Sequence, residues 1–387
     1  MSSRLFVELA YAFIPSGHGF DLVRAPCIEV DEEGIAGFSP GCPPGARRIP
    51  AVIMPALCNA HIHLLDYALA EMGEDRDLEE LVALPQGLKY RALQALSVSE
   101  VSRRLERLAS RLASRGTLYL GAYAELGKEG AEIITGVLKA RGIGVRVLAQ
   151  PVVKSYSEYR GLLELYKGVG LDTVFDISYS ELVELVRMAS NINGYVHVHV
   201  SETRQLRGMG DYEIVLGAKP HAAIHLTELS DEELLVLARE GIGVVFCPRS
   251  NMYHLGKLPR LSILPRLVEE TLVGLGTDNA AWIPPYIEEE AAYSYLSVHA
   301  SSRTSAKSIA TSILLSITTS CTKLLGLWDK EYDFLGRGAV ISLIPEIGWS
   351  SDPIITLVKR MASYKTLGIA PGQAASVISK LLSHSAY

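Results

Sequence analysis

Residues 51–64 read AVIMPALCNAHIHL, an apolar run that ends in two histidines separated by one residue. Such a run is typical of a strand that is buried in a parallel sheet. Residues i and i+2 of a strand point to the same face, about 6.6 Å apart at roughly 3.3 Å per residue. The imidazoles of His61 and His63 can therefore converge on one metal ion. Alone this is weak evidence, because two histidines at a polar strand end need not bind anything.

After this run, strand-like segments alternate with helical patterns, as expected for βα units around a parallel sheet. The predicted strands read AVIMPALCNAHIH, GTLYLGAYAE, GVRVLAQPVV, TVFDIS, GYVHVHV, HAAIHL, GVVFCP and LVGLGTD. Two intervening helices begin with capping-box patterns, Ser97 with Glu100 and Ser230 with Glu233. Eight strands favour an α/β fold of the (β/α)8 TIM-barrel type. An open doubly wound sheet stays open as an alternative, but it does not require eight strands.

Both ends of the chain have a different texture. The first 50 residues contain short strand-like runs separated by Gly/Pro segments such as IPSG and SPGCPPG. Near the other end, DFLGRGAVISLIP and DPIITLVKRMASY again resemble strands. A chain of 387 residues also exceeds the roughly 250 residues of a single barrel. We therefore expect a TIM barrel over residues 51–326 and a small composite β-sandwich domain from residues 1–50 plus 327–387.

The composition excludes several classes of protein. Hydrophobic residues make up 48% and charged residues 21%, which excludes a disordered chain. The net charge of -6 disfavours a nucleic-acid binder. No apolar run reaches the roughly 18 residues of a membrane span, and Glu8 interrupts the apolar N-terminus, which we interpret as a strand rather than a signal peptide. We expect a cytoplasmic protein without nucleic-acid or membrane partners, and the sequence leaves a homo-oligomer open.

The five cysteines form no CxxC pair and their number is odd. This count argues against a disulfide framework and predicts reduced, mostly buried thiols. Asn and Gln occur only five times each, which agrees with a thermophilic source.

Polar side chains also end three other predicted strands. His199 and Glu202 end the fifth strand, His225 the sixth and Asp278 the eighth. Because barrel enzymes keep their chemistry at the carboxyl ends of the strands, we expect these residues to meet His61 at one rim. Nitrogen and carboxylate ligands with an open water position describe a catalytic zinc or ferrous iron site.

Other polar residues have weaker claims. His197 and His221 lie deeper in the sheet, and we expect both to be structural. Candidates for substrate contact follow strand ends or lie in the first loop: Tyr67, Lys89, Arg91, Glu125, Arg249, Asn251, His254 and Trp282. We select Glu125, Arg249, His254 and Trp282 as substrate-binding candidates, although each is as compatible with packing, and Arg249 with bracing a loop.

The motifs PALCNAHIHL, HVHVSET, HLTELSDEEL, CPRSN and GTDN, in this order, resemble the amidohydrolase superfamily. They are most similar to the cytosine deaminase-like branch, with its S-adenosylhomocysteine/methylthioadenosine deaminases and triazine hydrolases. EELVALPQGLKYR further resembles archaeal amidohydrolases. The resemblance covers nearly the whole chain. It implies that His61, His63, His199 and Asp278 bind one divalent metal ion, Zn or Fe.

The resemblance also implies catalytic roles for Glu202, His225 and Asp278. Family members with two metals bridge them with a carboxylated lysine, often on the fourth strand, and TVFDIS has no lysine. We therefore expect one metal ion, and deamination of a heterocyclic base or nucleoside by a metal-bound hydroxide. The stretch GRGAVISLI departs from the family pattern, but this concerns only the small domain. The stretch GTLYLGAYAE and the absence of Arg and Trp just after HIHL also depart from it and make an adenosine-type substrate less secure. The alternatives are a cyclic amide hydrolase similar to imidazolonepropionase, a chlorohydrolase, and a non-catalytic binding or assembly protein.

Overall fold

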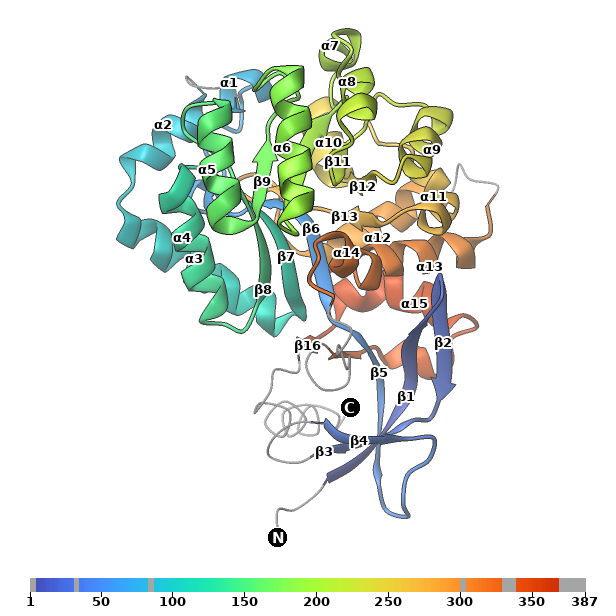
Figure 1. Cartoon of the computed structure of the whole chain (residues 1–387). Coiled ribbons are helices and arrows are strands. Elements are labelled where there is room, and N and C mark those ends of the chain that lie inside the picture. The colour runs from blue at the N-terminus through green and yellow to red at the C-terminus, as the bar shows by residue number, and fades with distance from the viewer. Residues whose placement is uncertain (1–4, 31–34, 83–86, 300–303, 329–338, 369–387) are drawn as a thin grey trace.

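The computed structural model describes residues 5–30, 35–82, 87–299, 304–328 and 339–368. Two sheets organise this part of the chain. A curled parallel sheet is surrounded by helices, and a second sheet lies below it in Figure 1. The structure is therefore of the α/β class.

The parallel sheet has nine strands in the order β13-β12-β11-β10-β9-β8-β7-β6-β14. In chain order these are β6 (Leu57–His63), β7 (Thr117–Ala124), β8 (Gly144–Ala149), β9 (Gly168–Leu171), β10 (Tyr195–Val200), β11 (Ala222–His225), β12 (Gly243–Phe246), β13 (Val273–Leu275) and β14 (Asp278–Asn279). Because β14 follows β13 after two residues and pairs with β6, the last strands of the sheet return to the first. The sheet is thus TIM-barrel-like, and the carboxyl ends of its strands share one rim.

Helices follow most of these strands and cover the outside of the sheet in Figure 1. The α-helices are α1 (Leu78–Val82), α2 (Leu88–Ala95), α3 (Val98–Ser114), α4 (Gly127–Lys139), α5 (Tyr156–Tyr166), α6 (Tyr179–Asn191), α7 (Arg204–Gly208), α8 (Asp211–Ala218), α9 (Asp231–Arg239), α10 (Pro248–Leu255), α11 (Leu264–Glu270), α12 (Ile287–His299), α13 (Ala306–Ser316), α14 (Thr319–Leu324) and α15 (Pro353–Arg360). Short 3-10 helices are η1 (Leu65–Leu69), η2 (Leu261–Ile263), η3 (Pro345–Gly348) and η4 (Met361–Ser363).

Helix caps fix where these helices begin. Both predicted capping boxes are confirmed: the Ser97 hydroxyl accepts from the Glu100 backbone N–H, while the Glu100 carboxylate accepts from the Ser97 N–H. Ser230 and Glu233 repeat the arrangement before α9. Each cap satisfies backbone donors that the first helical turn leaves unpaired.

The fourth strand was predicted wrongly. The strand is β9, with the sequence GVGL, whereas TVFDIS at residues 173–178 is a loop. In that loop the Asp176 carboxylate accepts from the Asp172 backbone N–H at 3.0 Å and from the Thr173 hydroxyl at 3.3 Å. A side chain at Gly168 would collide with the Val147 carbonyl, and one at Gly170 with the Tyr123 ring. The strand is glycine-rich because its neighbours approach closely, which weakens its strand signature.

The second sheet joins both ends of the chain. Its order is β16-β15-β5-β1-β3-β4, with β2 also paired to β1. The strands are β1 (Leu5–Ser16), β2 (Gly19–Arg24), β3 (Cys27–Val30), β4 (Ile35–Ser39), β5 (Arg47–Pro55), β15 (Ala339–Leu343) and β16 (Thr366–Gly368). Strand β15 pairs antiparallel with β5, which places Ile341 opposite Ile53. In the described residues this is one sheet and not two facing sheets.

The boundary between the two sheets differs from the predicted one. The chain passes from this sheet to the parallel sheet between Pro55 and Leu57, whereas Ala51, the predicted start of the barrel, lies within β5.

The stretch DPIITLVKR was predicted as a strand and is instead helix α15. The Asp352 side chain caps it by accepting from the backbone N–H groups of Ile354 and Ile355. Ile354, Leu357 and Val358 are buried, with the i, i+3, i+4 spacing of one helix face. An Asp followed by proline is a helix-start signal, and it outweighs the β-branched residues that suggested a strand.

The cysteine prediction was also wrong. Cys27 is bonded to Cys42, and Cys58 to Cys321, which leaves Cys247 as a buried free thiol. The partners of the second bond are 263 residues apart in sequence, yet their Cα atoms are 5.9 Å apart because α14 packs at the start of β6. Such pairing depends on the fold and cannot be read from cysteine spacing.

Among the helices of the described residues, none combines the length and the apolar character that a membrane span requires.

We predict that the unfolded, unreduced chain contains one thiol that reacts with a thiol reagent, because four of the five cysteines are paired. Full reduction should raise the count to five. Thiol titration in denaturant before and after reduction measures both numbers. Five reactive thiols before reduction would contradict the two bonds.

Candidate metal centre

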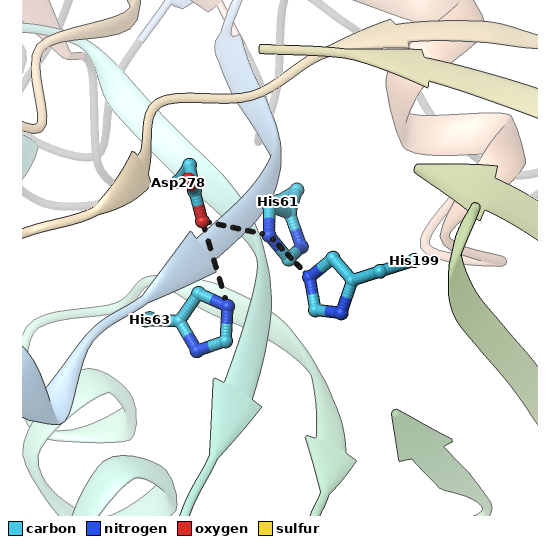
Figure 2. A group of neighbouring side chains, drawn as sticks. All are labelled: His61, His63, His199 and Asp278. Atoms are coloured by element: carbon cyan, nitrogen blue, oxygen red, sulfur yellow. Dashed lines mark hydrogen bonds and ion pairs between the residues drawn. The ribbon is translucent and has the colours of Figure 1, made fainter. Parts of the chain in front are cut away.

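Four side chains that end different strands meet at the rim of the parallel sheet. His61 Nε2 lies 3.1 Å from Asp278 Oδ1 and 3.2 Å from His199 Nε2, and His63 Nε2 lies 3.5 Å from the same Asp278 oxygen. Figure 2 shows the four side chains pointing toward one point. One ligand atom from each lies within 4.8 Å of all the others. Three nitrogens and one carboxylate oxygen at this spacing form a ligand set for a divalent ion.

The backbone of β14 brings Asp278 to this point. Its pairing with β6 sets Asp278 opposite Ile62. Two residues earlier, Gly276 passes so close to His61 that an added Cβ would lie 2.7 Å from the His61 Cβ, and only glycine fits there. Asp278 itself has a φ of 63° and His225 a φ of 71°, in the left-handed region that side chains rarely adopt. Such strain costs about 1–3 kcal/mol per residue and is typical of functional sites.

The outer ring nitrogens of two histidines fix how they face the centre. His199 Nδ1 lies 3.0 Å from the Leu171 carbonyl, an acceptor, so this nitrogen donates. His63 Nδ1 lies 2.5 Å from Glu125 Oε1 and donates in the same way. A neutral imidazole carries one N–H, so each Nε2 presents a lone pair to the centre. Metal-binding histidines are usually held by this kind of outer hydrogen bond.

Burial keeps His61 and His199 in the neutral form that binds metals, whereas at His63 the contacts with Glu125 and Asp278 outweigh burial and the Lys89 charge and raise the pKa. Burial lowers the pKa of His61 to about 3 and that of His199 well below its ordinary value, with neighbouring histidines adding to both shifts. Burial opposes ionisation of Asp278, but the contact with His61 and the nearby imidazoles hold its pKa well below the usual range. The neutral imidazoles of His61 and His199 and an ionised Asp278 carboxylate are therefore available together, and with His63 these residues fit a divalent metal ion.

Glu202 and His225 lie beside this ligand set. His225 Nδ1 is 3.7 Å from Glu202 Oε1 and 3.0 Å from the Asn251 side-chain amide. Glu202, His225 and Asp278 offer ligand-type atoms within 4.8 Å of one another. Burial raises the pKa of Glu202, and the negative charge of Asp278 adds to the shift. Ser250 donates a hydrogen bond of 2.5 Å to Asp278 Oδ2, the oxygen that does not face His61. The arrangement can accept and donate protons next to the ligand set.

A pocket of about 680 Å³ opens above this group. His63, His199, Glu202, His225 and Asp278 line its floor. Toward its mouth it is bordered by α1, by α7 and by the end of α10, with apolar side chains from Leu78, Val82, Leu206 and Leu255. The pocket is large enough for a small heterocyclic molecule.

Glu125 does not line the pocket, contrary to its selection as a substrate contact. It is 1% exposed and lies behind His63, where Lys89 Nζ contacts its Oε1 at 2.7 Å. The same ammonium lies 2.9 Å from Asp66 Oδ2 and 3.2 Å from His63 Nδ1. Burial raises the pKa of Asp66 to about 7, whereas Lys89 and His63 overcome burial at Glu125 and lower its pKa to about 2.

Two further substrate candidates also lie elsewhere. Arg249 donates to the carboxylates of Glu289 and Glu290 and to backbone carbonyls, so it braces a loop against α12. The Trp282 indole donates to the Met72 carbonyl and is buried outside the pocket. Both long side chains find partners among nearby loops, which sequence order does not reveal. Of the four candidates, His254 is the one that lines the pocket.

The deeper histidines lie where the sequence placed them. His197 is fully buried in β10 and contributes to none of the three clusters of metal-type ligands among the described residues. His221 Nδ1 accepts a hydrogen bond of 3.1 Å from the Val196 backbone N–H, which ties β11 to β10. Both have structural positions.

The pocket wall carries a charged group, Lys154, Asp172 and Asp176, that was not among the predicted site residues. Lys154 Nζ contacts Asp172 Oδ2 at 2.8 Å and Asp176 Oδ2 at 3.6 Å. Gln150 and Tyr90 donate to the two oxygens of Asp172. Asp172 follows β9 directly, so the misplaced fourth strand hid its position at the rim. The sequence did contain a signal for Asp172, namely the position of this aspartate between an apolar run and a turn.

Residues 52–330 match the family model described as "Amidohydrolase family". The chain belongs to the amidohydrolase family.

The relatives of this amidohydrolase include deaminases. A protein of Methanothermobacter thermautotrophicus is 27% identical over 342 residues, which cover 83% of this chain and 86% of the relative. The 5-methylthioadenosine/S-adenosylhomocysteine deaminase of Symbiobacterium thermophilum is 26% identical over 287 residues, 66% of this chain and 64% of the relative. Among solved structures, a zinc-bound adenosine deaminase from Xanthomonas campestris has a TM-score of 0.73 at 18% identity, covering 98% of this chain and 97% of that one.

This amidohydrolase is thus a hydrolase that acts on carbon–nitrogen bonds, in a metal-dependent family.

We predict that His199→Ala and Asp278→Ala reduce bound zinc from about one equivalent per chain to near zero, because each removes one of four ligands. His254→Ala is the matched control, since this histidine lines the pocket outside the ligand set and should leave zinc content unchanged. Elemental analysis of zinc-loaded, desalted protein measures the result. Full zinc content in either ligand variant would show that the set is wrong.

Proposed function

We propose that the protein deaminates a heterocyclic base or nucleoside, with one divalent ion, Zn or Fe, held by His61, His63, His199 and Asp278. The observation that carries this proposal is the position of Glu202 and His225 beside the ligand set on the pocket floor. The deaminase names of several relatives support the same reaction class.

When bound, a divalent ion supplies the Lewis acidity that makes water a nucleophile near neutral pH. His225, held by the Asn251 amide, would orient that water. Asp278, with one oxygen already occupied by Ser250, would accept its proton. Glu202, whose pKa is raised by burial, would donate its proton to a ring nitrogen and would then pass to the leaving amine the proton that Asp278 took from water. The proton of the hydroxyl added to the ring carbon would restore the acid form of Glu202. Each step uses a group that lies at the pocket floor.

The charges of the pocket favour a substrate without a carboxylate or phosphate. The two lysines that line it are already paired, Lys89 with Asp66 and Glu125, and Lys154 with two aspartates. Asp77 and Glu79 add negative charge near the mouth. Among the described lining residues, no cation is left to bind an anionic group. This disfavours the imidazolonepropionase-like alternative, whose substrate carries a carboxylate, and favours an uncharged amino-heterocycle.

We also propose the two-domain division predicted from the sequence, a (β/α)8 barrel and a small composite β domain built from both ends of the chain, with the first boundary between Pro55 and Leu57 rather than at Ala51. The pairing of β15 with β5 supports a composite domain. We also propose a cytoplasmic location, because the sequence has no apolar run of the roughly 18 residues that a membrane span needs.

We predict that the zinc- or iron-loaded enzyme releases ammonia from uncharged amino-heterocycles such as adenosine, guanine or cytosine, and much less from adenosine monophosphate than from adenosine. Glu202→Gln should lower kcat about 10²–10⁴-fold, the usual contribution of general acid–base catalysis, while metal content stays unchanged. The matched control is Glu228→Gln, a neighbouring carboxylate that lies outside the main pocket and pairs with Lys257.

Coupled ammonia detection and elemental analysis measure both quantities. Ring opening or halide release without ammonia would replace deamination by one of the alternative reactions. Undiminished turnover in Glu202→Gln would remove this residue from the mechanism.

A further inference from the structure

The parallel sheet closes at a short seam between its last strands and its first strand. Asp278 and Asn279, which form β14, pair with β6 at this seam, and among the described residues β13 forms no ladder with β6. The seam nevertheless positions the proposed metal centre, because it brings Asp278 of β14 to His61 and His63 of β6. Contacts that hold β6 and β13 side by side therefore also hold the ligand set together.

Helix α14 spans the other end of this seam, at the amino ends of the same strands (Figure 1). Ser320 Oγ accepts a hydrogen bond of 2.7 Å from the backbone N–H of Val273, the first residue of β13. The next residue of the helix, Cys321, is bonded to Cys58, the second residue of β6. Consecutive residues of one short helix thus hold β13 by a hydrogen bond and β6 by a covalent bond.

The seam is closely packed between this helix and the ligand set. Asn59 follows Cys58 and makes hydrogen bonds of 2.7 and 3.2 Å to Thr277, the neighbour of the aspartate ligand. A side chain at Gly276 would collide with His61, so no side chain separates the two backbones there. His61 lies three residues beyond Cys58, about 10 Å at roughly 3.3 Å per residue. A shift at the start of β6 is therefore passed on to the ligands.

General stabilisation accounts for only part of what this bond does. In the chain-entropy model a disulfide stabilises by restricting the unfolded chain, and more so when its partners are far apart in sequence. The separation of 263 residues between Cys58 and Cys321 predicts such an effect wherever the two residues lie in the fold. Their position adds a second effect, because the bond ties the strand that carries two ligands to the helix that holds β13.

We propose that α14 and the Cys58–Cys321 bond form a clasp on this seam, and that tight metal binding requires the disulfide form. Cys58 and Cys321 are then positioning residues, which act on the ligands through β6. This inference rests on the proposed metal centre. Reduction by a dithiol releases the clasp: the S–S bond breaks, the two cysteines take up two electrons and two protons, and the reductant closes into its own disulfide. By linkage, a bound metal ion favours the disulfide form by the same factor.

The dissociation constant of zinc tests the proposal. It is measured by competition with a chelator, at a temperature at which circular dichroism shows every variant to be folded. We expect Cys58→Ala/Cys321→Ala to raise this constant at least about fivefold, the lower end of couplings between distant sites. Cys27→Ala/Cys42→Ala is the matched control, because this pair lies outside the parallel sheet and should leave the constant unchanged.

A second control separates the clasp from general stability. Ile28→Ala removes a fully buried side chain from the apolar cluster of the second sheet. It should lower the temperature of unfolding without weakening zinc binding. If Ile28→Ala weakens zinc binding as much as Cys58→Ala/Cys321→Ala does, general stability sets the affinity and the proposal is wrong.

The outcomes also separate the clasp from the metal centre. No zinc in the unmodified protein would contradict the centre and the clasp together. Unchanged zinc affinity in Cys58→Ala/Cys321→Ala would leave the centre in place and contradict the clasp alone. If this variant does not fold without metal, circular dichroism is measured with and without zinc: folding that zinc restores supports the proposal, and a chain that stays unfolded in saturating zinc contradicts it.

Discussion

Strand β14 pairs with β6 in a register that sets Asn279 opposite His63, and the proposed metal centre depends on this pairing. The Asn59 side chain strengthens it by donating to the Thr277 hydroxyl at 2.7 Å and accepting from the Thr277 backbone N–H at 3.2 Å. Gly276 allows the close approach to His61. A shift of one residue would turn the Asp278 carboxylate away from the histidines, because successive side chains of a strand point to opposite faces.

Around this pairing, the buried ligand side chains are hydrogen-bonded by a second group of residues, and these in turn contact further polar groups. His61 and His199 stay neutral, and the outer nitrogens of His199 and His63 donate to the Leu171 carbonyl and to Glu125. Glu125 is in turn held by Lys89. Such second-layer contacts typically change metal affinity by 10–100-fold when removed. The electrostatics of the site thus extend one layer beyond the residues that would touch a metal ion.

The sequence predicted which residues come together in the candidate ligand set better than it predicted the residues around them. His61, His63, His199 and Asp278 follow strand ends, and parallel strands share a rim, so order along the chain was sufficient to bring them together. Lys89 comes from a helix, and its partners depend on how α2 packs, which no periodicity encodes.

Packing between distant segments also explains two of the errors in the predicted fold. Strand β9 is short and glycine-rich because Gly170 packs against Tyr123, so its signal was lost to the loop that follows. The pairing of Cys58 with Cys321 depends on contacts between distant segments. Helix α15 had a readable cap at Asp352, but β-branched residues suggested a strand. Local sequence patterns predicted the type of most elements. Packing between distant segments explains strand β9 and the disulfide bond, which those patterns did not show.

The central claim is that one metal ion binds at the rim where β6, β10 and β14 end. A crystal grown with zinc and measured on both sides of the zinc absorption edge tests it most directly. We expect one anomalous peak within about 2.0–2.2 Å of ligand atoms from His61, His63, His199 and Asp278. A peak at other residues, or the absence of a peak at these four, would show that this ligand set is wrong.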